Sequence, residues 1–209
     1  MRSIDTLIIG GGMGGLFAAY RLRNRYPDMD IVIIDKGAML QDRRCPAVNG
    51  RPCVHCKTCA ITSGVAGSGA FSDAKFNIGT AYGGTLSEEL GDDVAMQYIN
   101  EVDHILEGFS ENYPKMFESN EDLKLKCIQN NLRLLDMNVR HLGTDRNVVT
   151  MNNLVQHLRD QGVEISSNTV CMYLYKDPEN LNSFVLRVNE SLKKEYNIKA
   201  DNYQIIIYF

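Results

Sequence analysis

The chain has 209 residues, a formal net charge of −4 and 44% hydrophobic residues, which suits one domain with a real core. The acidic balance gives no electrostatic reason to expect nucleic acid or an anionic membrane as a partner. No apolar stretch approaches the ~20 residues that span a bilayer, and the first predicted strand begins at Ile4, too early for a cleavable signal. We therefore expect a cytoplasmic protein that acts on a small molecule.

The first predicted element is an apolar strand, from Ile4 to Ile9, that runs directly into a glycine-rich turn. Its last residues are consecutive aliphatics, typical of a strand covered on both faces: Leu7, Ile8 and Ile9. The glycines that follow have the spacing G-x-G-x-x-G: Gly10, Gly12 and Gly15. In this pattern the first glycine permits a tight turn, the second admits a pyrophosphate against the main chain, and the third lets helix and strand pack closely.

A helix is predicted after the turn, and its free N–H groups and positive dipole end would face the phosphates. It should end before Tyr26-Pro27, because the residue before a proline disfavours helix. Its inward stripe is expected at Leu16, Ala19 and Leu22 or Arg23.

The second buried strand is predicted at 31–34, and Asp35 stands at its carboxyl end. A carboxylate about 20 residues past the glycines is placed to accept both hydroxyls of an adenosine ribose, and it would repel a phosphate on that ribose. Strand, glycines, helix, second strand and acid arrive in order, which predicts a dinucleotide-binding domain. The predicted cofactor contacts here are Gly10, Gly12, Met13, Gly14, Gly15, Asp35 and Lys36.

The third strand does not follow within a few tens of residues, as the alternation of strands and helices in an NAD-type domain would require. Residues 36–85 are instead rich in Cys, Pro, Gly and Arg and show no helical or strand period. FAD-binding domains commonly hold an insertion at this point, so the gap favours FAD over NAD. We expect one incomplete domain over residues 1–209, with an insertion at 36–140.

The insertion holds four clustered cysteines with the spacing C-x7-C-x2-C-x2-C: Cys45, Cys53, Cys56 and Cys59. C-x2-C steps let thiolates converge on one metal or cluster, because a tight turn brings both sulfurs to one side. Zinc and an iron–sulfur cluster would both accept these four ligands, and His55 could replace one. Iron–sulfur is the preferred assignment beside a flavin, because zinc does not pass electrons. A redox dithiol and free loop thiols are the alternatives.

A second glycine-rich loop follows at 63–75. Its small residues permit close backbone approach, and its polar residues suit a flavin pyrophosphate or ring edge. The predicted cofactor contacts here are Gly67, Ser68, Gly69, Ala70, Asp73 and Lys75. Lys75 near the ring could stabilise negative charge on reduced flavin, and Asp73 could orient it. A merely flexible loop is the alternative.

Together, the glycine turn at 10–15, the four cysteines and the segment 63–76 resemble the largely uncharacterised FAD-dependent dehydrogenases of bacteria and archaea, which belong to the flavoproteins with two dinucleotide-binding domains. Their loop typically reads S-G-W-G-G-A-G-A-F-S-D-G-K-L, and this chain matches it at Ser63, Gly64, Gly67, Gly69, Ala70, Phe71, Ser72, Asp73 and Lys75. Residues 140–145 are also similar to that family. The resemblance implies FAD as cofactor and the N-terminal FAD-binding portion of such a protein, and it supplies no substrate.

The rest of the chain alternates helices and strands. An amphipathic helix that covers the insertion is predicted at 92–109, with Val94, Tyr98, Val102, Ile105 and Phe109 on one stripe and acidic residues on the other. Another helix begins near Asn147, and Gly162 is placed to end it in a left-handed cap. Residues 163–170 are predicted as the delayed third strand, and in the resembling flavoproteins the backbone at the position of Val170 contacts adenine.

The last strands are predicted from alternating patterns. Residues 171–176, 183–189 and 195–199 would form a small antiparallel meander, and residues 203–208 would return to the main sheet. In the resembling flavoproteins a substrate domain follows that return strand, whereas here Tyr208-Phe209 end the chain.

These features predict an α/β protein, a Rossmann-like FAD-binding domain with a parallel sheet, an antiparallel meander and a Cys/Gly-rich insertion. The expected function is that of a dehydrogenase-like, FAD-dependent oxidoreductase, which transfers hydride or electrons through flavin N5. No side chain identifies a catalytic base. The alternatives are a nucleotide-binding fragment without turnover and an NAD-binding protein.

Overall fold

The structure is a computed structural model that describes residues 2–47, 50–81, 83–118, 120–134, 137–176, 183–188, 195–199 and 204–207. Its contacts divide the chain into two compact units. Unit 1 holds residues 1–70 and 151–209, and unit 2 holds residues 71–150. The predicted α/β class is confirmed, since helices and strands occur in both units.

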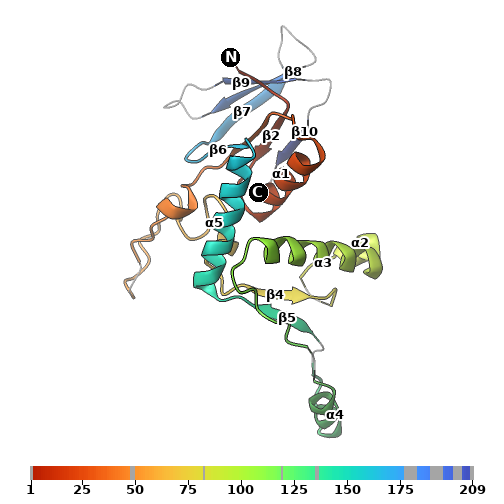
Figure 1. The fold of residues 1–209 in the computed structure, drawn as a ribbon. Coiled ribbons are helices and arrows are strands. Elements are labelled where there is room, and N and C mark those ends of the chain that lie inside the picture. Colours follow the sequence, from red (N-terminus) through yellow and green to blue (C-terminus); the bar gives the residue numbers. More distant parts are fainter. Residues whose placement is uncertain are drawn as a thin grey trace. The chain divides into compact units, whose positions relative to one another are not determined.

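The centre of unit 1 is a parallel sheet in the order β10-β2-β3-β6 (Figure 1). Its strands are β2 (Thr6–Ile9), β3 (Ile31–Ile34), β6 (Glu164–Ser166) and β10 (Gln204–Ile207). Every residue of β3 is buried, as its unbroken aliphatic sequence predicts. The delayed third strand is confirmed in β6, which pairs parallel with β3 but is shorter than predicted. The return strand is confirmed in β10, and its predicted ends, Tyr203 and Tyr208, lie outside the described residues.

Two helices flank this part of the chain. Helix α1 (Met13–Arg25) packs on β2 and β3 and ends before Tyr26-Pro27, as predicted. Its buried side is Gly15, Leu16, Ala19 and Arg23, so Arg23 completes the predicted stripe. Helix α5 (Thr144–Asp160) buries Met151, Leu154, Val155 and Leu158, and Gly162 follows with a φ of 82°. None of the helices in the described part of the chain combines the length and the apolar character that crossing a bilayer requires.

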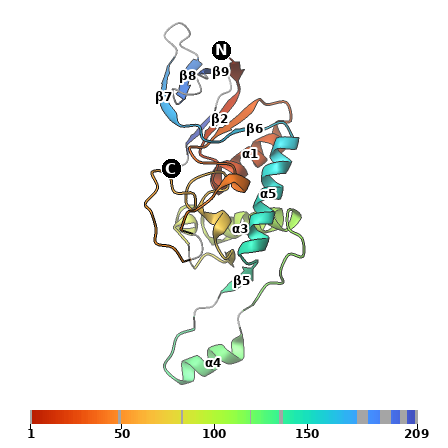
Figure 2. The same ribbon diagram turned by 90° about the vertical axis from the view of Figure 1, so that its left-hand side faces the viewer.

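A second sheet in unit 1 has the order β1-β9-β8-β7 (Figures 1 and 2). It contains β1 (Arg2–Ile4), β7 (Cys171–Lys176), β8 (Ser183–Val188) and β9 (Glu195–Lys199). The antiparallel meander is confirmed in β7, β8 and β9, and the predicted end of the second strand, Asn189, lies outside the described residues. Strand β1 joins β9 in parallel, so the single strand predicted at 4–9 is wrong. The chain changes sheets at Asp5, whose main-chain N–H and side-chain carboxylate both bond to Asp30.

Unit 2 is built on a two-stranded antiparallel sheet of β4 (Lys75–Ile78) and β5 (Asn138–His141). Its helices are α2 (Leu86–Leu90), α3 (Asp92–Gly108) and α4 (Glu121–Gln129). Helix α3 packs against β4 and α2, whereas α4 lies apart from the other elements of this unit in both views (Figures 1 and 2). Two short 3-10 turns, η1 (Leu40–Asp42) and η2 (Ser68–Phe71), complete the described secondary structure.

The buried face of α3 differs from the predicted stripe. Val94, Tyr98 and Val102 are exposed, while Ala95 and Leu106 are buried. The apolar period predicted the helix correctly, but the direction in which it faces depends on β4, which packs beside it. The predicted stripe of α3 is therefore wrong.

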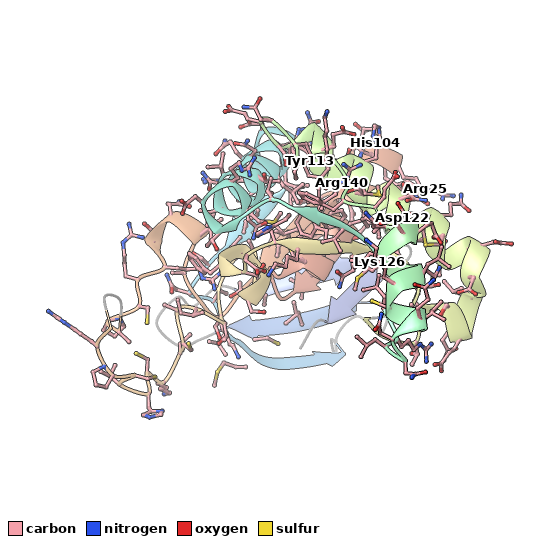
Figure 3. All side chains as sticks on the ribbon, turned by 90° about the horizontal axis from the view of Figure 1, so that it is seen from below. Arg25, His104, Tyr113, Asp122, Lys126 and Arg140 are labelled. Atoms are coloured by element: carbon pink, nitrogen blue, oxygen red, sulfur yellow. The ribbon has the colours of Figure 1, made fainter. Side chains whose placement is uncertain are left out.

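A polar cluster ties α3 to β5 in unit 2. The Arg140 Nε atom of β5 lies 2.9 Å from the Asp103 Oδ2 atom of α3, and the Tyr113 hydroxyl donates to Asp103 Oδ1 at 2.6 Å. The Arg140 guanidinium also lies over the Tyr113 ring, 5.0 Å from its centroid, and the two side chains are neighbours in Figure 3. Burial, and then the hydrogen bond to Asp103, raise the pKa of Tyr113 well above its usual value.

Candidate functional site

The glycine turn lies where the carboxyl end of β2 meets the start of α1. Gly10 has a φ of 108°, a conformation that favours glycine, and its N–H donates to the Ile34 carbonyl oxygen at 2.8 Å. A Cβ atom added to Gly15 would lie 2.0 Å from the Gly10 carbonyl oxygen. The third glycine therefore lets helix and turn come together, as the spacing predicts.

Gly12 opens helix α1 without filling the space in front of it. It has no side chain with which to cap the helix, and the first turn contains no acidic residue. Beyond the chain neighbours, the atom nearest to a Cβ added at Gly12 would be the Gly67 Cα atom, at 4.0 Å. Main-chain N–H groups at the positive end of the helix dipole are thus the groups offered to an anion here.

The Asp35 carboxylate faces the glycine turn. Its Oδ2 atom accepts the Gly11 N–H at 2.8 Å, and its Oδ1 atom accepts the Gly37 N–H at 2.8 Å. The residue is only 8% exposed. Because a carboxylate oxygen has more than one lone pair, each oxygen can still accept a hydroxyl hydrogen bond. Lys36, the next residue, is exposed.

The second glycine-rich loop reaches the same turn within unit 1. The Ala66 N–H donates to the Gly11 carbonyl oxygen at 2.7 Å. A Cβ added to Gly67 would lie 3.2 Å from the Gly12 Cα, and one added to Gly69 would lie 3.5 Å from Met13 Cγ. The structure therefore brings residues 66–69 beside the turn. Ser68 in this loop is exposed and Ala70 is buried.

Val170 lies one residue from a main-chain contact of Asp35. The Thr169 N–H donates to the Asp35 carbonyl oxygen at 2.8 Å, and the Asn168 N–H donates to the Gly37 carbonyl oxygen at 2.7 Å. These bonds hold the segment after β6 against the chain at Asp35. Val170 itself is 39% exposed, and its contact with adenine stays a prediction.

Comparison with known proteins addresses the fold. Residues 8–40 match the family described as NAD(P)-binding Rossmann-like domain. No curated protein matches the sequence.

Among solved structures, the 3-ketosteroid-Δ4-(5α)-dehydrogenase of Rhodococcus jostii RHA1 is 12% identical, with a TM-score of 0.57 over 99% of this chain and 45% of its own. The L-α-glycerophosphate oxidase of Mycoplasma pneumoniae, solved with FAD bound, is 13% identical, with a TM-score of 0.52 over 98% of this chain and 53% of its own.

The chain has a Rossmann-like dinucleotide-binding fold. The adenylylsulfate reductase of Archaeoglobus fulgidus shares it, with 17% identity and a TM-score of 0.51 over 99% of this chain and 30% of its own. The chain spans about half the length, or less, of these neighbours. The predicted resemblance to the N-terminal, FAD-binding portion of an oxidoreductase is confirmed in fold.

The Rossmann-like unit also contains an arginine that sequence reasoning missed. Arg43 is 4% exposed and donates to four main-chain carbonyl oxygens, those of Ala60, Ile61, Val65 and Gly67, at 2.6–3.0 Å. Burial lowers the pKa of its guanidinium, and the charges of Asp35 and Cys59 oppose that shift. A sequence does not show which main-chain carbonyl oxygens a side chain will reach. Only the Arg43-Arg44 pair itself could have drawn attention to this residue.

Asp73 and Lys75 belong to unit 2. The Lys75 Nζ atom lies 2.7 Å from the Asp73 Oδ2 atom, and both side chains are more than half exposed. The hydrogen bond from Lys75 is the largest cause that lowers the pKa of Asp73. The predicted contacts of these two residues with a flavin stay predictions.

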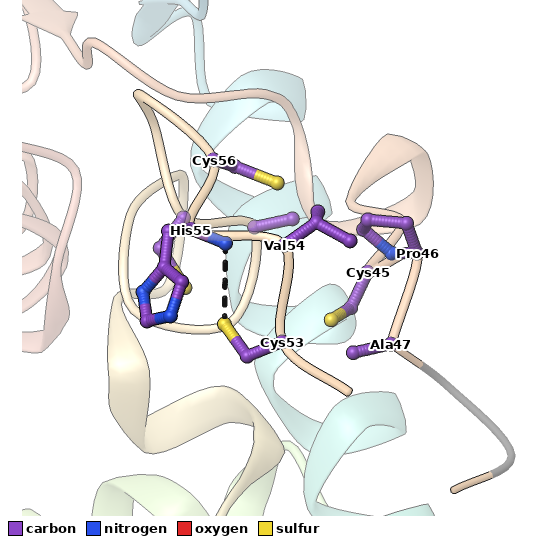
Figure 4. Close-up of a pocket in the computed structure, with 9 residues that line it drawn as sticks. Cys45, Pro46, Ala47, Cys53, Val54, His55 and Cys56 are labelled. Atoms are coloured by element: carbon purple, nitrogen blue, oxygen red, sulfur yellow. Dashed lines mark hydrogen bonds between the residues drawn. The ribbon is translucent and has the colours of Figure 1, made fainter. Parts of the chain in front are cut away.

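The four clustered cysteines line one pocket of the Rossmann-like unit, with a volume of about 280 Å³. Figure 4 shows Cys45, Cys53 and Cys56 around it, with Val54 between them. The Cys53 sulfur accepts the His55 N–H at 3.5 Å. Hydrogen bonds from the Thr62 hydroxyl and then from main-chain N–H groups lower the pKa of Cys59.

The structure shows no metal site among the described residues. In the described ranges of the chain, no three or more His, Cys, Asp or Glu side chains are arranged to hold a metal ion. The prediction of zinc or an iron–sulfur cluster at Cys45, Cys53, Cys56 and Cys59 is therefore not confirmed by the structure. All four thiols are free of disulfides, and Cys53, Cys56 and Cys59 are exposed.

Proposed function

We propose that this chain binds FAD and forms the FAD-binding portion of an oxidoreductase that acts on a small molecule. The observation that carries the proposal is the convergence of three features on one turn: the bare Gly12 position, the Gly67 backbone beside it, and the Asp35 carboxylate on the Gly11 N–H. A pyrophosphate suits main-chain N–H groups at a helix start, and a ribose suits a carboxylate next to them.

Two observations favour FAD over NAD. The third parallel strand, β6, begins at Glu164, long after β3 ends at Ile34, whereas a simple NAD-binding unit alternates strands and helices without such a gap. The glycerophosphate oxidase that shares the fold was solved with FAD bound. The family match at residues 8–40 fits both dinucleotides, because both place a pyrophosphate at the glycine turn.

Different residues of the chain would bind different parts of the cofactor. Asp35 and the backbone near Val170 would hold the adenosine, and residues 10–15 would hold the pyrophosphate. The flavin would extend toward residues 67–70 of the same unit, and the flavin contacts of Asp73 and Lys75 stay predictions. A bound flavin supplies hydride or electron transfer at N5, which no side chain of the chain supplies by itself.

The proposal is tested on the purified protein by absorption spectroscopy and by identification of the nucleotide released on denaturation. We expect a yellow protein that releases FAD. Release of NAD, or of no nucleotide even after incubation with FAD, would contradict the proposal. Bound FAD that no donor reduces would favour a binding fragment without turnover over an enzyme.

A further inference from the structure

The cysteine pocket of unit 1 has no role in the proposed FAD site. Its lining includes all four clustered cysteines, Cys45, Cys53, Cys56 and Cys59, together with His55 and Val54. These thiols come from two separate parts of the loop, one before and one after residues 48–52. Four thiols that converge on one pocket from two chain segments are the donor set of a sulfur-ligated centre.

The order of these cysteines follows a pattern known from iron–sulfur proteins. Cys53, Cys56 and Cys59 form a C-x2-C-x2-C run, and the remaining thiol belongs to the Cys45-Pro46 pair. In bacterial two-cluster ferredoxins, a C-x2-C-x2-C run supplies three ligands of a [4Fe–4S] cluster, and the fourth comes from a cysteine elsewhere in the chain that precedes a proline. The present chain contains the same two parts with the Cys-Pro pair first, which is the order found for one of the two ferredoxin clusters.

The size of the group that would bind separates a cluster from a single ion. A tetrahedral zinc ion with Zn–S bonds of about 2.3 Å draws its sulfurs to within about 4 Å of one another. No described group of side chains meets such a requirement. A four-iron cluster instead binds one thiolate at each iron and holds the sulfurs apart, and the pocket of about 280 Å³ leaves room for a group of that size.

A main-chain donor points at the Cys53 sulfur, which accepts the His55 N–H, as Figure 4 shows. Hydrogen bonds to the sulfurs stabilise the thiolate form that ligates iron, and they set the reduction potential of such clusters.

Arg43 holds the chain at one side of the pocket, because it bonds to Ala60, a residue of the lining. Its guanidinium holds the carbonyl oxygens of Ala60 and Ile61, which follow the last cysteine, and that of Gly67, which lies beside Gly12. One buried side chain therefore fixes both the end of the cysteine run and the loop at the proposed cofactor turn.

We propose that Cys45, Cys53, Cys56 and Cys59 are the four ligands of a [4Fe–4S] cluster. The proposal goes beyond FAD binding and does not depend on it. A cluster bound here would carry one electron at a time. Arg43 links the end of the cysteine run to Gly67, which lies beside the glycine turn.

The test uses the full chain, purified without oxygen and reconstituted with ferrous iron and sulfide. Iron, acid-labile sulfide, zinc and FAD are measured per chain, and the dithionite-reduced sample is examined by electron paramagnetic resonance. We expect about four iron and four sulfide per chain, with the signal of a reduced cluster. Cys56→Ser and Cys45→Ser should each lose most of the iron and the signal, while Cys127→Ser, which changes a cysteine outside the pocket, should keep both.

Thermal unfolding of the apoproteins shows whether the serine variants still fold. A wild-type chain that takes up no iron, one that binds zinc instead, or one in which mass spectrometry finds a Cys56–Cys59 disulfide would overturn the proposal. Full cluster retention in Cys45→Ser would overturn the four-thiolate assignment. Because FAD is measured in the same samples, loss of the cluster and loss of the flavin are distinguished.

Discussion

At the residue scale, two glycines of one turn have opposite surroundings. Gly15 faces the Gly10 carbonyl oxygen so closely that a Cβ would lie 2.0 Å away, whereas a Cβ at Gly12 would meet its nearest atom at 4.0 Å. Gly15 is therefore required by packing, and Gly12 leaves room for a ligand. The same motif thus has one glycine required for packing and one required for binding. Substitution of Gly15 should change stability, and substitution of Gly12 should change cofactor binding.

Gly15→Ala should destabilise the protein by about 1–3 kcal/mol or more, because the added methyl group overlaps a main-chain atom that moves only with the turn. Denaturant unfolding of the apoprotein measures the change. Gly108→Ala is a suitable control, since no atom lies within 4 Å of a Cβ added there. Equal stability of Gly15→Ala and the wild type would contradict the close approach of helix and turn.

Asp35→Asn should weaken both the fold and FAD binding. The carboxylate accepts two main-chain N–H groups, and an amide nitrogen in place of one oxygen would face one of those donors, at a cost of about 1–3 kcal/mol. Unfolding by urea and titration with FAD measure the two effects. Asp42→Asn, at an exposed position, should leave both unchanged. Tighter FAD binding by Asp35→Asn would contradict the assigned ribose contact.

At the element scale, helix α5 shows how a periodic sequence fixes a buried face. Leu154 is fully buried in this helix, while Val149, five residues before it, is 48% exposed. Leu154→Ala should cost about 2–5 kcal/mol by loss of burial and by the cavity left behind. Val149→Ala should change the unfolding free energy by less than about 0.5 kcal/mol. Similar losses in both variants would show that the buried face is assigned wrongly.

The Tyr113 cluster predicts a pH effect in unit 2. Because the native pKa of Tyr113 lies above its usual value near 10, the native state keeps its hydroxyl proton at pH values where the unfolded chain releases it. The contribution to stability is complete below pH 10 and falls as the pH rises beyond it. Between pH 8 and pH 11 the unfolding free energy of the wild type should therefore fall more than that of Tyr113→Phe. Parallel pH profiles would contradict the raised pKa of Tyr113.

At the scale of the whole molecule, local patterns predicted the β2-α1-β3 segment and its glycine turn correctly. Consecutive aliphatics, fixed glycine spacing and the Tyr26-Pro27 break are all short-range signals. The late strands β6 and β10 were also found, because β6 follows a helix that ends at Gly162 and β10 is an apolar run. The place of the proposed dinucleotide site could thus be derived from residue order.

Features that depend on distant parts of the chain could not be derived. The pairing of β1 with β9 joins residues almost 200 positions apart, and nothing local distinguishes it from a continuation of β2. The main-chain acceptors of Arg43 and the inward face of α3 likewise exist only in the folded chain. The zinc or iron–sulfur site at the four cysteines stays a prediction for a related reason, since spacing gives the order of the thiols but not their separation.

The claim on which the account depends most is that a pyrophosphate lies against the bare backbone of Gly12. Gly12→Val places a branched side chain there while the backbone, with φ of −69°, stays in a conformation open to valine. We expect the wild-type chain to hold FAD and this variant to lose it, with an unchanged thermal unfolding midpoint of the two apoproteins. Stoichiometric FAD retained by Gly12→Val would contradict the account.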